Sequence, residues 1–180
     1  MRLVAAGALF AVITVTIPAF SQTPVTLVPR VLLGGMVEML APAEFQPMSA
    51  EMLRQKYPTE RRPTLALANA AGSVSVALNH TRTALPAAAL PEAHRHFEQT
   101  FRRLHPTAQW FRSELTTVNG REWILLDLRT PAIDTEVRNL MMATSVDERL
   151  LLIAVNMTKA LEGEWLDAAN RMIASVVIRP

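Results

Sequence analysis

The sequence predicts an α+β fold: a three-layer α/β/α sandwich around a central, mainly antiparallel sheet of about six to seven strands. Tight connections at 119–120 (Asn-Gly) and 147–148 (Asp-Glu) join strand-like runs, and strands joined by tight turns are antiparallel. Residues 150–155 are apolar without interruption, so this strand needs cover on both sides. Amphipathic stretches at 92–104 and 161–172 supply helices for the two outer layers.

The N-terminus has the pattern of an export signal, which we expect to span residues 1–21. Arg2 provides a positive start, and the uncharged run 3–17 is shorter than the roughly 20 residues that a membrane-spanning helix needs. The small residues Ala19 and Ser21 fit the positions that a signal peptidase recognises. We therefore expect a periplasmic or secreted protein with no membrane anchor after the signal is removed.

The mature chain is expected to begin with an extended lead-in over residues 22–35 and to continue as one α/β domain over residues 36–180. The elements expected in that domain are, in chain order, a strand at 36–40, a helix at 50–56, a hairpin at 64–69 and 73–79, a helix at 92–104, a hairpin at 108–118 and 121–129, a strand pair at 136–146 and 149–157, a helix at 161–172 and a short strand at 176–178.

Local signals support these elements one by one. Ser49 is a helix-capping residue before the first helix. Val74, Val76 and Leu78 alternate with small residues, which is typical of a strand with one buried face. The Asn-Gly pair at 119–120 favours a type I′ turn, because both central residues of that turn need a positive φ. The last helix has an apolar stripe of Leu161, Trp165, Ala168, Ala169 and Met172.

Composition excludes several classes of protein. The 180 residues include no cysteine, so disulfides, thiolate zinc sites and a lipid on an N-terminal cysteine are excluded. Half of the residues are apolar, which is enough for one buried core. The net charge of +2 is too small to favour nucleic acid as a partner.

No metal site and no cofactor site is expected. His94 and His96 are two residues apart and point to opposite sides of a helix, so only His94 and Glu98 share a face. Asp127 shares a strand face with Trp123, and we expect Arg112 on the neighbouring strand to pair with it. The alternative is a small-ligand-binding protein or a hydrolase that uses Asp127 with His94 or His105.

Aromatic residues are the remaining candidates for a site. Trp110 and Trp123 lie on the two strands of one predicted hairpin, and Tyr57 ends the first helix. Packing in the core accounts for such residues in most small domains. If a groove binds a partner, we expect Tyr57, Trp110 and Trp123 to line it.

The chain also resembles the PsbP-like superfamily, which includes the Ran-binding Mog proteins and bacterial periplasmic DcrB-type proteins. The resemblance covers most of residues 36–179. It is carried by Phe45-x-x-Met48, Lys56-Tyr57-Pro58, Ala77-Leu78-Asn79, Asn119-Gly120 before Trp123, and Leu151-x-x-Ala154-Val155-Asn156. It implies an antiparallel sheet flanked by helices and a non-enzymatic protein that docks onto a larger assembly. It supplies no catalytic residue that matches this chain.

Together these observations predict an exported, non-enzymatic accessory or binding protein of the bacterial envelope. Its partner is expected to be another envelope protein.

Overall fold

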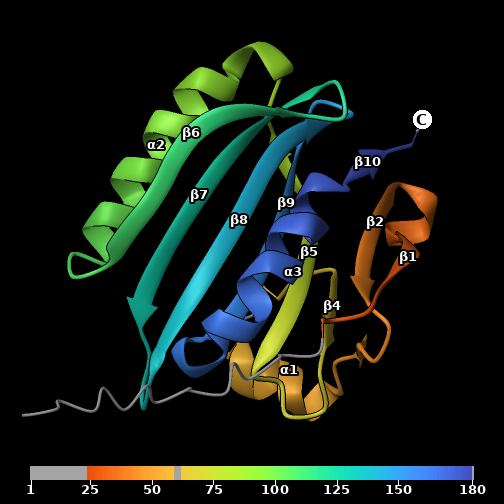
Figure 1. The fold of residues 1–180 in the computed structure, drawn as a ribbon. Helices are drawn as coiled ribbons and strands as arrows, with labels where there is room; N and C mark the ends of the chain where they lie inside the picture. Colours follow the sequence, from red (N-terminus) through yellow and green to blue (C-terminus); the bar gives the residue numbers. More distant parts are fainter. Residues whose placement is uncertain (1–23, 59–61, 180) are drawn as a thin grey trace, which may run out of the picture.

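The computed structural model describes residues 24–58 and 62–179, so the predicted export signal lies outside the described residues (Figure 1). Three helices and ten strands form the described part, with short 3₁₀ turns between some of them. In chain order they are β1 (Leu27–Leu32), β2 (Val37–Pro42), β3 (Gln46–Pro47), α1 (Ala50–Lys56), β4 (Leu65–Ala68), β5 (Val74–Ala84), α2 (Leu90–Leu104), β6 (Gln109–Val118), β7 (Arg121–Pro131), β8 (Glu136–Val146), β9 (Arg149–Thr158), α3 (Glu162–Ala174) and β10 (Val177–Ile178).

The main sheet has seven antiparallel strands in the order β3-β4-β5-β9-β8-β7-β6. Its central strand is β9, as the apolar run at 150–155 predicted. Leu151, Ile153 and Val155 are buried in the core on one face of the sheet. Leu150 and Leu152 pack into a second core on the other face. The predicted antiparallel α+β sandwich is therefore confirmed.

Helices cover both faces of this sheet (Figure 1). On one face, α3 packs over β8 and β9, and its Trp165 stacks on Phe45 with 5.5 Å between ring centroids. On the opposite face, α2 covers β6 and β7 through Phe97 and Phe101. The short helix α1 covers β4 on that same face through Met52 and its neighbours. None of the described helices is long and apolar enough to cross a bilayer.

A second, three-stranded sheet of order β1-β2-β10 corrects the prediction at both ends of the domain. The lead-in expected over residues 22–35 contains strand β1, which pairs with β2 along its whole length. Pro29 is compatible with this strand because β1 lies at the sheet edge, where a missing N–H costs no ladder bond. The strands expected at 36–40 and 176–178 are real, but they belong to this small sheet and not to the central one.

A buried ion network holds the N-terminus of α3 against the main sheet. Asp127 is only 2% exposed and accepts two hydrogen bonds from Arg138, at 2.5 and 2.9 Å. The predicted partner Arg112 also contacts Asp127, with 3.5 Å between Nε and Oδ2. Glu162, the first residue of α3, accepts hydrogen bonds of 2.6 and 2.5 Å from Arg129. The sequence pattern did not indicate Arg138 because it lies on β8, and the residues between β7 and β8 carry no hairpin signal such as the Asn-Gly pair that joins β6 to β7.

Removing the carboxylate of Asp127 leaves the buried guanidinium of Arg138 without its main counter-ion. We expect Asp127→Ala to lower the free energy of unfolding by about 3–5 kcal/mol. The double variant Asp127→Leu/Arg138→Met removes both charges and should recover much of that loss. Urea unfolding measures both. A loss below about 1 kcal/mol for Asp127→Ala would show that the network is not buried as described.

Candidate functional site

The three aromatic residues predicted to line a groove do not share one surface. Trp123 is fully buried on the face that α3 covers. Trp110 packs on the α2 face, beneath the guanidinium of Arg102 at 4.4 Å from its ring centroid. Its partner in the β6–β7 register is Leu128, five residues along β7 from Trp123. Tyr57 packs with α1 on β4, and burial raises the pKa of its hydroxyl.

The acidic and basic groups of the alternative hypothesis are also separated. Asp127 lies on the α3 face, where two arginines neutralise it. His94 lies on the α2 face, with its Nε2 atom 2.9 Å from the hydroxyl of Ser113. His105 ends α2 on that same side of the sheet. In the described part of the chain, no three metal-ligating side chains gather at one point.

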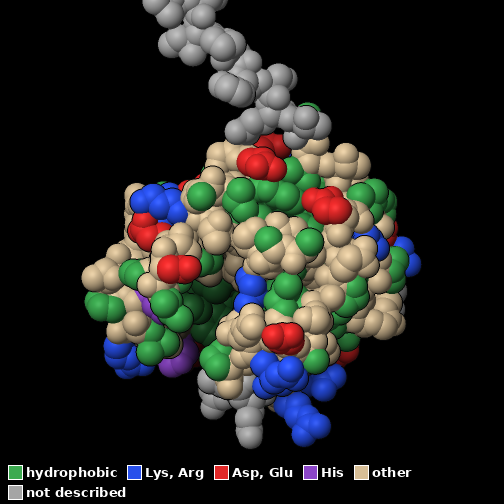
Figure 2. Space-filling view, turned by 90° about the horizontal axis from the view of Figure 1, so that it is seen from below, with side chains coloured by type: hydrophobic (Ala, Val, Ile, Leu, Met, Phe, Trp, Pro, Cys, Tyr) green, Lys and Arg blue, Asp and Glu red, His purple; other side chains and the backbone are tan. Residues whose placement is uncertain are grey.

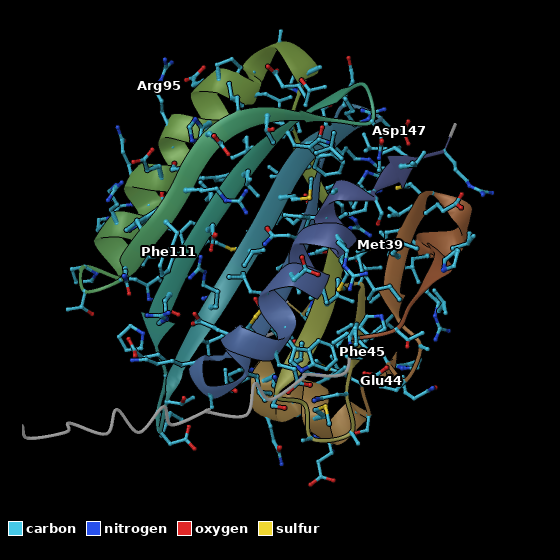
Figure 3. The ribbon with its side chains drawn as sticks, in the orientation of Figure 1. Met39, Glu44, Phe45, Arg95, Phe111 and Asp147 are labelled. Atoms are coloured by element: carbon cyan, nitrogen blue, oxygen red, sulfur yellow. The ribbon has the colours of Figure 1, made fainter. Side chains whose placement is uncertain are left out.

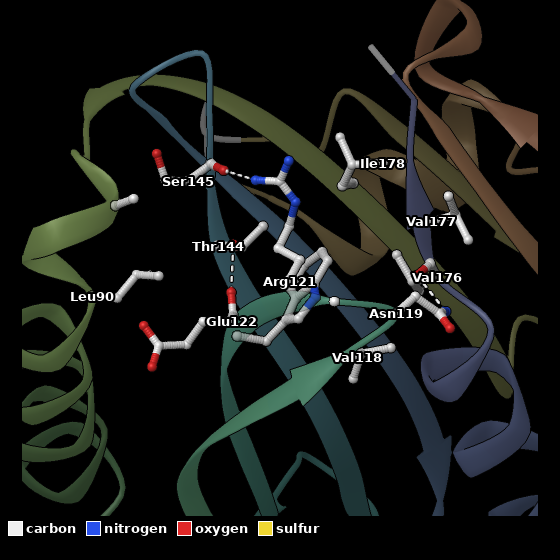
Figure 4. Close-up of a pocket in the computed structure, with 13 residues that line it drawn as sticks. Leu90, Val118, Asn119, Arg121, Glu122, Thr144, Ser145, Val176, Val177 and Ile178 are labelled. Atoms are coloured by element: carbon white, nitrogen blue, oxygen red, sulfur yellow. Dashed lines mark hydrogen bonds between the residues drawn. The ribbon is translucent and has the colours of Figure 1, made fainter.

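Two adjoining cavities lie at the end of the main sheet where β6 turns into β7 and β8 turns into β9, and Figure 4 shows the first of them. Their volumes are about 390 and 560 Å³, and both are lined by Arg121 and Ile178. We call this pair of cavities the turn-end cleft. Its walls come from the β6–β7 turn, the end of β8, strand β10, the loop before β2 and the start of α2. Asp147 lies at this end of the sheet, whereas Phe111 lies at the other end (Figure 3).

The β6–β7 turn fixes one wall of the cleft. Asn119 and Gly120 have φ values of +48° and +80°, which confirms the predicted turn. The side-chain amide of Asn119 donates to the carbonyl oxygens of Ala174 and Val176, at 3.2 and 3.0 Å. These two hydrogen bonds attach the turn to the segment that enters β10. The β6–β7 turn and the segment before β10 are therefore held together as one wall of the cleft.

Arg121 carries a positive charge into the cleft. Its Nη1 atom donates to the carbonyl oxygen of Ser145 at 2.7 Å. No carboxylate of the described residues forms an ion pair with it, in contrast to Arg129 and Arg138. The next carboxylate along the strand, Glu122, points away from Arg121, because successive side chains of a strand face opposite sides (Figure 4).

Two more groups in the cleft lack partners. Trp123 lines the first cavity, and its indole N–H finds no hydrogen-bond acceptor among the described residues. A buried donor without an acceptor costs about 1–3 kcal/mol. Strand β10 is the edge of the small sheet, and the amide of Arg179 donates to the carbonyl oxygen of Met36, the residue before β2, at 2.9 Å. Backbone groups alternate along a strand, so the N–H and C=O of Ile178 face away from β2, on the cleft side.

A different hollow lies on the α2 face of the sheet. It is a cavity of about 310 Å³ with an apolar lining, floored by Met141, Leu152 and Ala154 and walled by Phe97 and Phe101 of α2. We call it the α2 groove. The view from below shows a hollow in the surface with hydrophobic side chains inside it, beside histidines (Figure 2).

Sequence reasoning missed both hollows. The Asn-Gly turn placed Arg121 at the start of a strand, but nothing local indicated that β10 would lie beside it. The proximity depends on the small sheet, whose strands β1, β2 and β10 come from the two ends of the domain.

Comparison with known proteins identifies the fold. No family model matches the sequence, and no curated protein matches it significantly. Among solved structures, the solution structure of cyanobacterial PsbP (CyanoP) from Synechocystis sp. PCC 6803 superposes with a TM-score of 0.59 at 10% identity, covering 89% of this chain and 97% of that one. LpqN of Mycobacterium tuberculosis, described as involved in cell envelope biogenesis, superposes with a TM-score of 0.55 at 12% identity, covering 87% and 92%. A Bacteroides thetaiotaomicron protein gives 0.54 at 10% identity, covering 84% of this chain and 48% of its own. These likenesses show that the chain has the PsbP-like fold.

The wall formed by Asn119 gives a test of the cleft's construction. We expect Asn119→Asp to lower the free energy of unfolding by about 1–2 kcal/mol, since Asp tolerates the positive φ but cannot donate to the two carbonyls. Asn119→Gly, which also accepts this φ and lacks the amide, should lose a similar amount. Chemical denaturation measures both. An unchanged Asn119→Gly variant would contradict a stabilising role for the two hydrogen bonds.

Proposed function

We propose that this chain, which has the PsbP-like fold, is an exported accessory protein of the bacterial envelope that acts by binding another envelope protein in its turn-end cleft. The observation that carries the proposal is the pair of groups with free hydrogen-bonding capacity that lie side by side there: the guanidinium of Arg121 and the edge of β10 at Ile178. Groups of this kind gain hydrogen bonds when a partner docks.

Two further observations support a binding role in the envelope. The first 21 residues have the pattern of an export signal. LpqN, which shares the fold, is described as involved in envelope biogenesis. Catalysis by Asp127 with a histidine has no geometric support, because the main sheet lies between Asp127 and His94 and two arginines neutralise the carboxylate.

Blocking the cleft tests this proposal. Val177 of β10 is 41% exposed beside the cleft, and Val31 of β1 is 55% exposed on the same small sheet. We expect the native chain to capture a stoichiometric partner from envelope extracts, Val177→Arg to lose it, and Val31→Arg to retain it. Quantitative affinity capture of the three tagged proteins measures this.

The pair of valine variants makes the outcome specific to the cleft. Both introduce the same charge and bulk on an exposed strand of one sheet, so a loss of folding or solubility should affect both. Retention of the partner by Val177→Arg, or an equal loss in both variants, would contradict docking at the turn-end cleft.

The second candidate function is the binding of a small apolar ligand in the α2 groove. The wholly apolar lining of that cavity favours it, and a volume of about 310 Å³ is at the lower end of known ligand sites. This function needs no contribution from Asp127, His94 or His105.

A neutral apolar dye tests the second candidate. We expect N-phenyl-1-naphthylamine to bind saturably if the groove accepts ligands, because an apolar pocket raises its fluorescence. Ala154→Phe fills the floor of the cavity and should abolish the signal, whereas Ala160→Phe at an exposed position should not. Equal dye binding by all three proteins would exclude the α2 groove as the binding site.

A further inference from the structure

We propose that the occupant of the turn-end cleft is an extended, carboxylate-bearing peptide segment of the partner, with its carboxylate on Arg121 and its backbone along β10. This inference rests on the proposed function and adds the chemistry of the ligand. It follows from three features of the described residues, taken in turn below.

The first feature is that most N–H donors of the Arg121 guanidinium have no acceptor among the described residues. A guanidinium has five N–H donors in a fixed plane. Among the described residues, the guanidinium of Arg121 has one acceptor, the carbonyl oxygen of Ser145. The remaining donors suit the two oxygens of a carboxylate, which a guanidinium binds in a bidentate manner. A half-buried cation without a counter-ion favours an anionic ligand over a neutral one.

The second feature is the charge around Arg121. Glu122 points to the opposite face of the strand, and Arg179 at the rim of the second cavity is already paired with Glu38. Asp147 also lies at that rim, where it is exposed to solvent and its field is screened by salt. Glu122 also lines the first cavity, near Leu90 of α2, whereas Arg121 lies on the side of Ser145 and β10 (Figure 4). The cavity therefore presents a positive charge to a ligand on its β10 side.

The third feature is the backbone edge beside the guanidinium. Ile178 has its N–H and C=O on the cleft side, and Val118 and Val176 line the same cavity. An extended peptide can pair with such an edge while alternate side chains enter the apolar part of the wall. A small free anion would leave the strand edge unpaired, so the combination favours a peptide.

Peptides of defined chemistry test this inference by NMR titration of the full mature chain labelled with ¹⁵N. The probes are an acetylated six-residue peptide of alternating Val and Thr that ends in Asp with a free C-terminus, the same peptide amidated, an amidated version ending in Asn, and sodium acetate. Signals of the backbone amides and of the three tryptophan indoles report the site, with the Trp123 signal assigned by its loss in Trp123→Phe.

We expect the two Asp peptides to shift the signals of Arg121, Ile178 and the Trp123 indole, and to bind at least tenfold more tightly than the Asn peptide. Comparing the affinities of the free and amidated Asp peptides shows whether Arg121 binds the C-terminal carboxylate or the side-chain carboxylate of Asp. Arg121→Met should weaken binding of the Asp peptides at least tenfold and abolish the preference over Asn. Arg179→Met, the control at the rim, should leave both unchanged. Acetate should shift the backbone amide signal of Arg121 without shifting that of Ile178.

Several results would overturn the inference: equal affinity for the Asp and Asn peptides, an unchanged affinity in Arg121→Met, shifts confined to the α2 groove, or no shift at millimolar peptide. The capture experiment with Val177→Arg does not depend on these results. If the peptides fail but Val177→Arg loses the captured partner, the partner docks in the cleft without a carboxylate; if both experiments fail, no partner docks there.

Discussion

The structure depends on strand β9, which is apolar on both of its faces. A strand of this kind is stable only at the centre of a sheet with cover on each side. Helix α3 and the small sheet cover one face, and α1 and α2 cover the other. Most of the large apolar side chains of the described residues are buried in these cores. The turn-end cleft lies where the layers end, at the turn end of the sheet, and the α2 groove lies beside α2.

The arginines on the α3 face of the main sheet differ in whether a carboxylate neutralises them. Asp127 and Glu162 neutralise Arg138 and Arg129, and the hydrogen bonds from Arg129 hold the pKa of Glu162 below its usual range. Arg121 lies on the same face of the same strand as Arg129, yet its one bond is to a neutral carbonyl oxygen. A buried cation that is paired ties elements together, whereas an unpaired one in a cleft leaves binding free energy for a ligand. That contrast is our reason for placing the function at Arg121.

Local patterns predicted most of the fold and little of the site. The Asn-Gly turn, the apolar run of β9 and the stripe of α3 each depend on neighbours in the sequence, so periodicity and turn chemistry were enough. Asp127 pairs with Arg138 across strands β7 and β8, whose connection carries no hairpin signal such as Asn-Gly. The position of β10 beside Arg121 depends on residues far apart in the sequence, which no local pattern encodes. Trp123 shows the limit clearly: its type favoured core packing and left a binding surface open, and only its position on the inner face of β7 shows that it is a buried residue beside a cavity.

The central claim is that the partner docks where the layers of the sandwich end at the turns. Hydrogen–deuterium exchange of the mature chain, alone and in the presence of an envelope fraction, tests it most directly. The account predicts slower exchange in residues 118–123 and 176–179 when the partner is bound, because the free edge of β10 becomes hydrogen-bonded. Slower exchange confined to α2 and β8, or identical exchange in both samples, would contradict it.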